Sequence, residues 1–227
     1  MTNVPVPTPF RLPRFYPILD TSVLAARECS VLMAGETLID AGACILQYRH
    51  KQDWTQAHFD DAKQLAKLCH EAGVLFVLND RADFARLLKS ALHVGQDDLS
   101  PVAARRVISD EVMGFSTHNR DQLVRGNEEA VEYLSIGPIF QTASKLKPDP
   151  VVGVEKLREL RALTEKPLAA IGGITLENAS QVFAAKADSV AVISGIVPRT
   201  CTRKMWKSHA QEWLQVCLQS PQLKQAR

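Results

Sequence analysis

The sequence predicts a single-domain (βα)8 TIM barrel, an α/β fold with a short N-terminal arm and a C-terminal helix. Short β-branched runs alternate with longer segments of helical period, and eight such runs can be counted. Nearly every run also ends in a cluster of polar residues, although its body is apolar. In an α/β barrel the carboxyl ends of all strands meet at one rim, so we expect one site built from many loops.

The eight expected strands share a short apolar body bounded by turn or polar residues. In chain order they are placed at residues 16–19, 43–48, 74–78, 91–94, 112–115, 131–136, 167–171 and 189–193. Between them, segments 55–72 and 154–163 have the apolar spacing of amphipathic helices. Gly42, Gly73 and Asn127 are expected at helix ends, and Thr175 is expected to cap the helix that follows Gly172 and Gly173.

The length fits one domain, because 227 residues that are 46% hydrophobic can bury a large core. We expect an N-terminal arm over residues 1–14, the barrel over 15–216 and a polar tail over 217–227. The arm is rich in proline and is expected to be loose. A doubly wound open sheet is the alternative fold, disfavoured because no GxGxxG follows the first strand and because both halves of the chain contribute polar groups.

Composition argues against several classes of protein. A net charge of +2 is too small to indicate nucleic acid or an anionic membrane as a partner. Five cysteines without a CxxC motif indicate reduced thiols and a cytoplasmic location, and not a disulfide framework or zinc knuckle. No apolar run approaches the roughly 20 residues that cross a bilayer, and the first residues are too polar for a signal peptide.

The segment QYRHK, at the end of the second expected strand, has the most constrained geometry. Alternate side chains of a strand share a face, so Gln47, Arg49 and Lys51 are expected to point one way. Tyr48 and His50 are expected to point the other way. Arginine binds phosphate oxygens bidentately and lysine supplies a point charge, so this wall is suited to phosphate.

Acidic turns follow the next two strands. Asp80 and Asp98 could each offer a carboxylate to Mg2+, which is typically held by one or two carboxylates plus substrate phosphates. Asp97 competes with Asp98 for this role, and the role of His93 stays open. The alternative is that these aspartates pair with Arg49 and Lys51 as salt bridges at the rim, with no metal between them.

The later strands end in groups suited to a second phosphate. The loop after the sixth strand carries Thr142, Ser144 and Lys145, and its alternatives are a lid or an ordinary polar loop. The last two strands end in the pairs Gly172–Gly173 and Ser194–Gly195. Such loops after strands seven and eight form the usual phosphate site of this fold, because glycine lets backbone N–H groups approach an anion.

Seven segments in order resemble one known family. The match runs from about residue 15 to residue 197, and the segments that carry it are QYRHK, NDRADFA, HVGQDDL, GFSTHN, YLSIGPIFQTASK, IGGIT and VAVISGI. The chain resembles thiamine-phosphate synthase in all seven. The resemblance implies a homo-oligomeric barrel that, with Mg2+, joins hydroxymethylpyrimidine diphosphate to thiazole phosphate, giving thiamine phosphate and pyrophosphate.

The resemblance also implies roles for individual positions. The residues that would bind the pyrimidine diphosphate are Gln47, Arg49, Lys51, Asn79 and Lys145, with Ser116 nearby. The residues that would contact the thiazole phosphate are Thr142, Ser144, Gly173, Ile193 and Ser194. Asp80 and Asp98 would hold Mg2+. The catalytic residues would be Arg49, Lys51 and Lys145, which stabilise the leaving diphosphate as its C–O bond ionises.

Some positions depart from the family pattern, and other functions stay open. Ser144 replaces a common threonine, and KADSVAV carries Lys186 and Ser189 where glycines are usual. The alternatives are a thiazole tautomerase-like or regulatory relative, another phosphate-handling barrel enzyme, and a non-catalytic phosphate-ligand-binding relative. None of these alternatives needs nucleic acid or a membrane as a partner.

Overall fold

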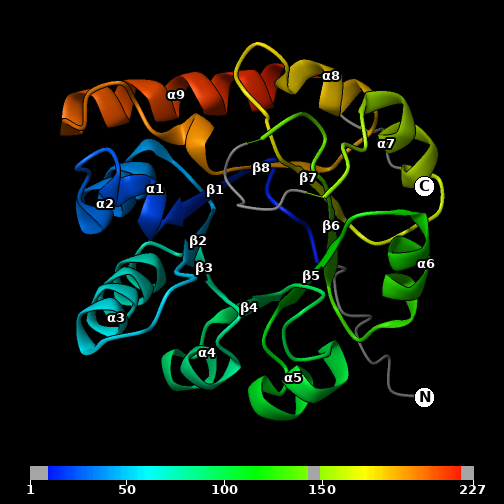
Figure 1. Ribbon diagram of the computed structural model, residues 1–227. Coiled ribbons are helices and arrows are strands. Elements are labelled where there is room, and N and C mark those ends of the chain that lie inside the picture. Colours follow the sequence, from blue (N-terminus) through cyan, green and yellow to red (C-terminus); the bar gives the residue numbers. More distant parts are fainter. Residues whose placement is uncertain (1–9, 143–148, 221–227) are drawn as a thin grey trace, which may run out of the picture.

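A computed structural model describes residues 10–142 and 149–220. Eight parallel strands pair in chain order and close into a barrel, with β1 hydrogen-bonded to both β2 and β8. Figure 1 shows the helices as an outer ring around these strands. The strands are β1 (Phe15–Asp20), β2 (Ile45–Arg49), β3 (Leu75–Asn79), β4 (Ala91–Val94), β5 (Met113–Thr117), β6 (Tyr133–Ile136), β7 (Leu168–Ile171) and β8 (Ser189–Val192). The expected fold class is therefore confirmed.

The helices lie between the strands in sequence and outside them in space. They are α1 (Thr21–Ala25), α2 (Val31–Ala41), α3 (Gln56–Glu71), α4 (Ala82–Leu88), α5 (Pro101–Ile108), α6 (Arg120–Glu128), α7 (Val154–Arg161), α8 (Ala179–Ala184), the 3-10 turn η1 (Ser194–Ile196) and α9 (Arg203–Gln219). The expected helices at 55–72 and 154–163 correspond to α3 and α7. The expected C-terminal helix is α9, and the boundary placed at residue 216 falls inside it.

Some helix ends lie at the residues expected from the sequence, and others do not. Gly42 ends α2 in the left-handed region, with φ of 106°, as expected of a glycine there. Helix α6 continues one residue past Asn127. The expectation that Thr175 caps the next helix is wrong, because Asn178 occupies the N-cap of α8. The Asn178 side chain accepts the Thr175 N–H at 2.8 Å, so residues 175–178 form a turn before the helix begins.

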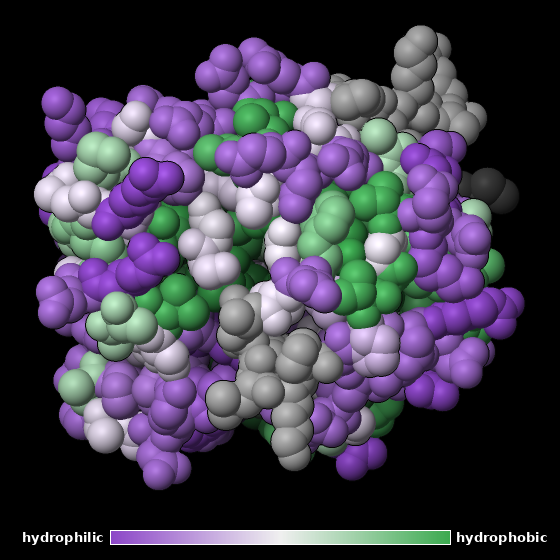
Figure 2. Space-filling model, turned by 45° about the horizontal axis from the view of Figure 1, so that its top comes forward, coloured by the Kyte–Doolittle hydropathy of each residue, from purple (hydrophilic) through white to green (hydrophobic). Residues whose placement is uncertain are grey.

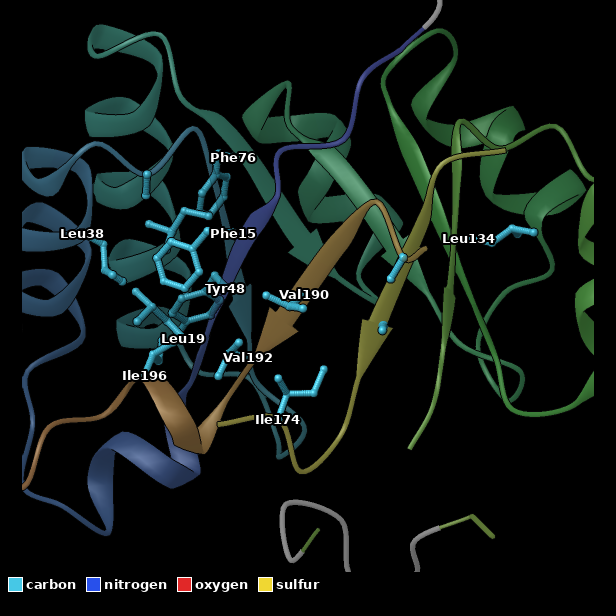
Figure 3. Packing of buried hydrophobic residues seen from close by; sticks show 14 of the residues in the cluster. Phe15, Leu19, Leu38, Tyr48, Phe76, Leu134, Ile174, Val190, Val192 and Ile196 are labelled. Atoms are coloured by element: carbon cyan, nitrogen blue, oxygen red, sulfur yellow. The ribbon is translucent and has the colours of Figure 1, made fainter. Parts of the chain in front are cut away.

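Strand residues alternate between two apolar environments. Outward side chains such as Leu19, Tyr48 and Phe76 pack together under the helices, as Figure 3 shows. Inward side chains such as Tyr16 and Ile45 fill the barrel and belong to a separate buried cluster. Both faces of every strand are therefore covered, which is the usual state of a parallel sheet.

Residues 10–14 are packed against the barrel, although the arm was expected to be loose. Phe10 stacks on Tyr133 with ring centroids 6.0 Å apart, and Leu12 is buried with the inward cluster. The Arg14 guanidinium donates to the carbonyl of Cys217 at 2.7 Å and lies over the Phe183 ring. These residues hold the start of β1 against the end of α9.

The expectation of reduced cysteines is wrong for one pair. A disulfide joins Cys29 to Cys201, whose Cα atoms lie 5.3 Å apart and which are separated by 172 residues in sequence. It links the segment before α2 to the segment before α9. Of the other cysteines, Cys44 is exposed and Cys69 and Cys217 are buried, all three as free thiols.

The face of the molecule shown in Figure 2 is mostly polar. Figure 2 shows hydrophilic residues over most of the face that it displays, with hydrophobic residues between them. Within the described ranges, the helices are too short or too polar to span a bilayer.

Replacing Tyr48 by phenylalanine is expected to raise the free energy of unfolding by about 1 kcal/mol. Its hydroxyl is fully buried and, within the described part of the chain, has no hydrogen-bond partner, so burying it is a net cost. Urea unfolding of Tyr48→Phe measures this. Tyr16→Phe is the comparison, because the Tyr16 hydroxyl has two partners and its loss should destabilise the protein. A destabilised Tyr48→Phe variant would contradict the expectation.

Candidate active site

The carboxyl ends of β2, β3 and β4 bring the expected cations and carboxylates together. Lys51 Nζ lies 2.5 Å from Asp80 Oδ2 and 3.9 Å from Asp98 Oδ1. Gln47 and Arg49 lie on the inward face of β2, whereas Tyr48 packs outward, so the alternation expected within QYRHK is confirmed. In this state Lys51 forms the salt bridges that the alternative interpretation expected, but Arg49 does not.

The partner of Arg49 is Asp20, a residue that the sequence analysis missed. Asp20 ends β1, lies directly beside Arg49 in the register of β1 and β2, and is 4% exposed. Its Oδ2 accepts a hydrogen bond from the Arg49 guanidinium, and its Oδ1 accepts the N–H groups of Ser22 and Val23 at 3.1 Å each. Asp20 therefore caps α1 and fixes the guanidinium at once. A polar residue at the end of an apolar strand was the signal that could have found it.

Asp80 and Asp98 share one hydrogen bond and titrate as a pair. Burial raises the pKa of Asp80 to about 6; its hydrogen bond with Asp98 adds to this increase, and Lys51 opposes it. Burial alone would raise the pKa of Asp98 too, but hydrogen bonds from Asp80 and from the Gly95 N–H, at 2.8 Å, keep it lowered. Asp97 is exposed, so Asp98 is the carboxylate that faces Lys51.

These residues fit a divalent cation such as Mg2+. Within the described ranges there is no cluster of three or more His, Cys, Asp or Glu ligands. Mg2+ does not need one, because one or two carboxylates and substrate phosphates commonly complete its shell. Burial, with a smaller contribution from Asp98, raises the pKa of Asp80, so the ionised form of Asp80 is unfavourable here without another cation. The oxygen donors and their charge therefore suit a hard cation.

Asn79 ends β3 on the inward face, next to this pair. It is 5% exposed, and among the described residues its Nδ2 has no hydrogen-bond acceptor. A buried donor without an acceptor costs about 1–3 kcal/mol. A ligand oxygen or ring nitrogen at this point would satisfy it, which agrees with the binding role expected for Asn79.

The otherwise apolar barrel interior contains a group of hydrogen-bonded polar side chains below the rim, which the sequence did not indicate. His93 Nε2 lies 2.8 Å from Ser116 Oγ, and His93 Nδ1 lies 3.0 Å from the Tyr133 hydroxyl. Burial lowers the pKa of His93 to about 4. Tyr133 also contacts Tyr16, whose hydroxyl accepts from Gln47. An aromatic residue in a strand is usually core, so sequence alone gave no reason to place Tyr16 and Tyr133 near the site.

The ends of β6, β7 and β8 form the other side of the rim. Backbone N–H groups of Ile139 and Phe140 donate to the carbonyls of Ile171 and Gly172, so the segment after β6 runs along the end of β7. Gly173 has φ of +65°, and a Cβ there would lie 2.4 Å from the Gln141 carbonyl oxygen. Only glycine fits this close approach without movement.

The remaining expected positions are placed as follows. Thr142 and Ile193 are half-buried and Ser194 is exposed, at the start of η1. Ser116 lies inside the barrel and contacts Ser135 Oγ at 3.2 Å. Ser144 and Lys145 lie outside the described residues.

Gly173→Ala is expected to weaken the binding of a phosphate ligand at the ends of β6, β7 and β8 at least tenfold. The matched control is Gly73→Ala, because Gly73 has nearly the same φ, +67°, but among the described residues a Cβ there meets nothing within 4 Å. Both variants carry the left-handed strain of roughly 1–2 kcal/mol, and only Gly173→Ala adds the clash. The measurement is KM for thiazole phosphate, the ligand that the sequence resemblance implies at this position, in both variants, with thermal unfolding alongside. Equal KM values would show that the close approach does not matter.

Comparison with known proteins identifies the family. A family model described as thiamine monophosphate synthase matches residues 15–196. The chain belongs to the thiamine monophosphate synthase family. The thiamine-phosphate synthase of Koribacter versatilis is 44% identical over 212 residues, covering 91% of this chain and 96% of that protein. The thiamine-phosphate synthase of Chloroflexus aurantiacus is 36% identical over 185 residues, covering 81% and 85%.

Solved structures agree with the membership of the thiamine monophosphate synthase family. A thiamine phosphate pyrophosphorylase from Pyrococcus furiosus superposes with a TM-score of 0.76 at 26% identity, over 89% of this chain and 96% of that one. The resemblance drawn from the seven sequence segments is therefore confirmed.

Proposed function

We propose that this chain is a thiamine-phosphate synthase, a transferase that condenses 4-amino-2-methyl-5-hydroxymethylpyrimidine diphosphate with 4-methyl-5-hydroxyethylthiazole phosphate. The products are thiamine phosphate and pyrophosphate. The observation that carries the proposal is the position of Lys51 between Asp80 and Asp98, at the same rim as Arg49. Cations and carboxylates from different strands at one rim suit a diphosphate and its metal.

The reaction needs stabilisation of a leaving group and little proton transfer. The C–O bond of the pyrimidine diphosphate breaks with its electron pair leaving on pyrophosphate. The lone pair of the thiazole nitrogen then forms the new C–N bond. Arg49 and Lys51, with Lys145 from outside the described residues, bind the diphosphate where negative charge builds up, which lowers the barrier. We assign the catalytic roles to these three residues.

The remaining roles are divided between the two substrates and the metal. Asp80 and Asp98 would hold Mg2+, which when bound neutralises charge on the diphosphate. The residues that we assign to the pyrimidine substrate besides the cations are Gln47, Asn79 and Ser116. The residues that we assign to the thiazole phosphate are Thr142, Ser144, Gly173, Ile193 and Ser194. The backbone at Gly173 supports the second assignment, since a side chain there would fill the approach.

Three further expectations from the sequence stay predictions. They are a homo-oligomeric assembly, a cytoplasmic location, and the division into an arm, a barrel and a tail at residues 14 and 216. The small-molecule substrates follow from the proposed reaction.

The test is a direct assay. Purified protein is mixed with both phosphorylated substrates and Mg2+, and we expect thiamine phosphate and pyrophosphate in equal amounts. Omitting either substrate, or adding a chelator, should stop product formation. Calorimetry with the diphosphate separates the alternatives: binding without turnover would indicate a non-catalytic ligand-binding relative, and no diphosphate binding would indicate a thiazole tautomerase-like relative.

A further inference from the structure

A continuous chain of hydrogen bonds crosses the barrel interior from β2 to β5. Gln47 Nε2 donates to the Tyr16 hydroxyl at 2.7 Å, and the Tyr16 and Tyr133 hydroxyls lie 2.7 Å apart. Tyr133 then contacts His93 Nδ1 at 3.0 Å, and His93 Nε2 contacts Ser116 Oγ at 2.8 Å. Both ends of this chain are residues that we assign to the pyrimidine substrate.

The first four side chains of this hydrogen-bond chain are shielded from water, so each of their protons needs an acceptor within the protein. Gln47, Tyr16, Tyr133 and His93 are all buried, with exposed fractions between 0% and 7%. Gly114 lies between His93 and Tyr133 in the register of β4, β5 and β6. A Cβ on Gly114 would lie 2.1 Å from the Tyr133 ring and 2.5 Å from His93 Nδ1. The two rings therefore meet because Gly114 has no side chain.

Given the orientation of the Gln47 amide, counting protons fixes the direction of the other bonds in this hydrogen-bond chain. The Gln47 amide N–H faces the Tyr16 oxygen, so the Tyr16 proton goes to Tyr133. The Tyr133 proton then has His93 Nδ1 as its remaining acceptor among the described residues. If Nδ1 carried a proton instead, whether the ring was neutral or charged, the Tyr133 proton would be buried without an acceptor.

The direction of these hydrogen bonds determines whether Ser116, at the β5 end, can donate a hydrogen bond to a ligand. His93 must carry its proton on Nε2 and donate it to Ser116 Oγ. Ser116 accepts this bond, so its own proton is available to another group. Ser135 Oγ, at 3.2 Å, is a longer contact that a ligand acceptor could replace.

We propose that Tyr16, Tyr133 and His93 are positioning residues that fix the Gln47 amide and present the Ser116 hydroxyl to the pyrimidine substrate as a hydrogen-bond donor. The substrate named here rests on the proposed function; the hydrogen-bond chain does not. Removing a group that orients a metal ligand commonly costs ten- to a hundredfold in affinity or activity, and we expect a comparable cost for a group that orients a substrate-binding residue. Tyr133→Phe is therefore expected to lower kcat/KM for the pyrimidine diphosphate about tenfold or more.

The first test reads the His93 tautomer by nitrogen NMR of protein with 15N-labelled histidine and no substrate. His93→Gln assigns the signal by its disappearance. We expect an unprotonated Nδ1 and a protonated Nε2 in the parent protein, and a shifted Nδ1 signal in Tyr133→Phe, because Nδ1 loses the hydrogen bond that it accepts. Tyr48→Phe is the matched control, because the Tyr48 hydroxyl is not part of the hydrogen-bond chain. This variant should leave the His93 signal unchanged. A proton on Nδ1 in the parent, or an Nδ1 signal that Tyr133→Phe leaves unchanged, would overturn the proposal.

The second test separates positioning from packing. His93→Gln keeps an N–H that reaches Ser116, whereas His93→Leu keeps only bulk. We expect His93→Gln to retain at least ten times the kcat/KM of His93→Leu, and equal values would overturn the positioning role. A parent protein that makes no thiamine phosphate would overturn the proposed function alone, because the tautomer is read without turnover.

Discussion

Lys51→Ala is expected to lower kcat/KM about a hundred- to a thousandfold, mainly through kcat. The ammonium lies between two carboxylates at the rim, at 2.5 and 3.9 Å, where the diphosphate and its metal are assigned. As the C–O bond ionises, negative charge grows on the leaving pyrophosphate, and a fixed positive charge there is worth about 3–4 kcal/mol. Steady-state kinetics with both substrates and saturating Mg2+ measures the loss.

The matched control is Lys67→Ala on α3. Its side chain is 75% exposed and makes one surface ion pair with Glu71, so its loss should leave turnover within twofold. Thermal unfolding of both variants shows whether the fold survives. Lys145→Ala should resemble Lys51→Ala if the residue shares the leaving-group role. Parental turnover by Lys51→Ala would remove the basis for the assigned chemistry.

The sequence predicted the strand face on which a side chain lies better than it predicted the residue that the side chain contacts. The period of two in QYRHK placed Gln47, Arg49 and Lys51 on one face without knowledge of the neighbouring strands. The partner of Arg49 depends on the register of β1 and β2, which sets Asp20 directly opposite. Register between parallel strands is a property of the closed barrel, so local patterns did not indicate it.

Contacts inside the barrel were likewise not predictable from local sequence patterns. Tyr16, His93 and Tyr133 come from three strands, and each looks like a core residue in its own segment. Gly114 looks like an ordinary strand glycine, yet its missing side chain lets two rings meet. Cys29 and Cys201 are likewise brought together by closure of the outer layer, across 172 residues of sequence. These features arise from long-range packing, and short-range periodicity carries no information about them.

Asp80→Asn is expected to stabilise the metal-free protein and to weaken Mg2+ binding together. Burial raises the pKa of Asp80 from 3.8 to about 6, so the folded state holds this proton more tightly than the unfolded chain does. Ionised Asp80 therefore destabilises the fold above pH 6, and the penalty disappears below about pH 4, where both states are protonated. Asparagine stays neutral throughout. We expect a gain of about 3 kcal/mol at pH 7 and little at pH 4, measured by urea unfolding.

The same substitution should weaken Mg2+ binding on the order of a hundredfold, because a carboxylate ligand is lost. Calorimetry with Mg2+ and inorganic pyrophosphate measures this without turnover. In the parent protein Mg2+ must displace the Asp80 proton, so its affinity should fall as the pH drops below about 6. A metal-binding carboxylate is indicated if Asp80→Asn raises the free energy of unfolding but lowers the affinity for Mg2+. A carboxylate that stabilises the fold would instead lower the free energy of unfolding when it is replaced.

Asparagine is the substitution of choice because Asp80 has φ of 65°. Asn tolerates the left-handed region better than most residues, so the variant adds little backbone strain. Asp97→Asn is the control, since Asp97 is exposed and should change neither stability nor Mg2+ affinity. A less stable Asp80→Asn variant at pH 7 would mean that the salt bridge to Lys51 outweighs the burial of the carboxylate. Asp80 would then be a structural partner of Lys51, and the metal would need another ligand.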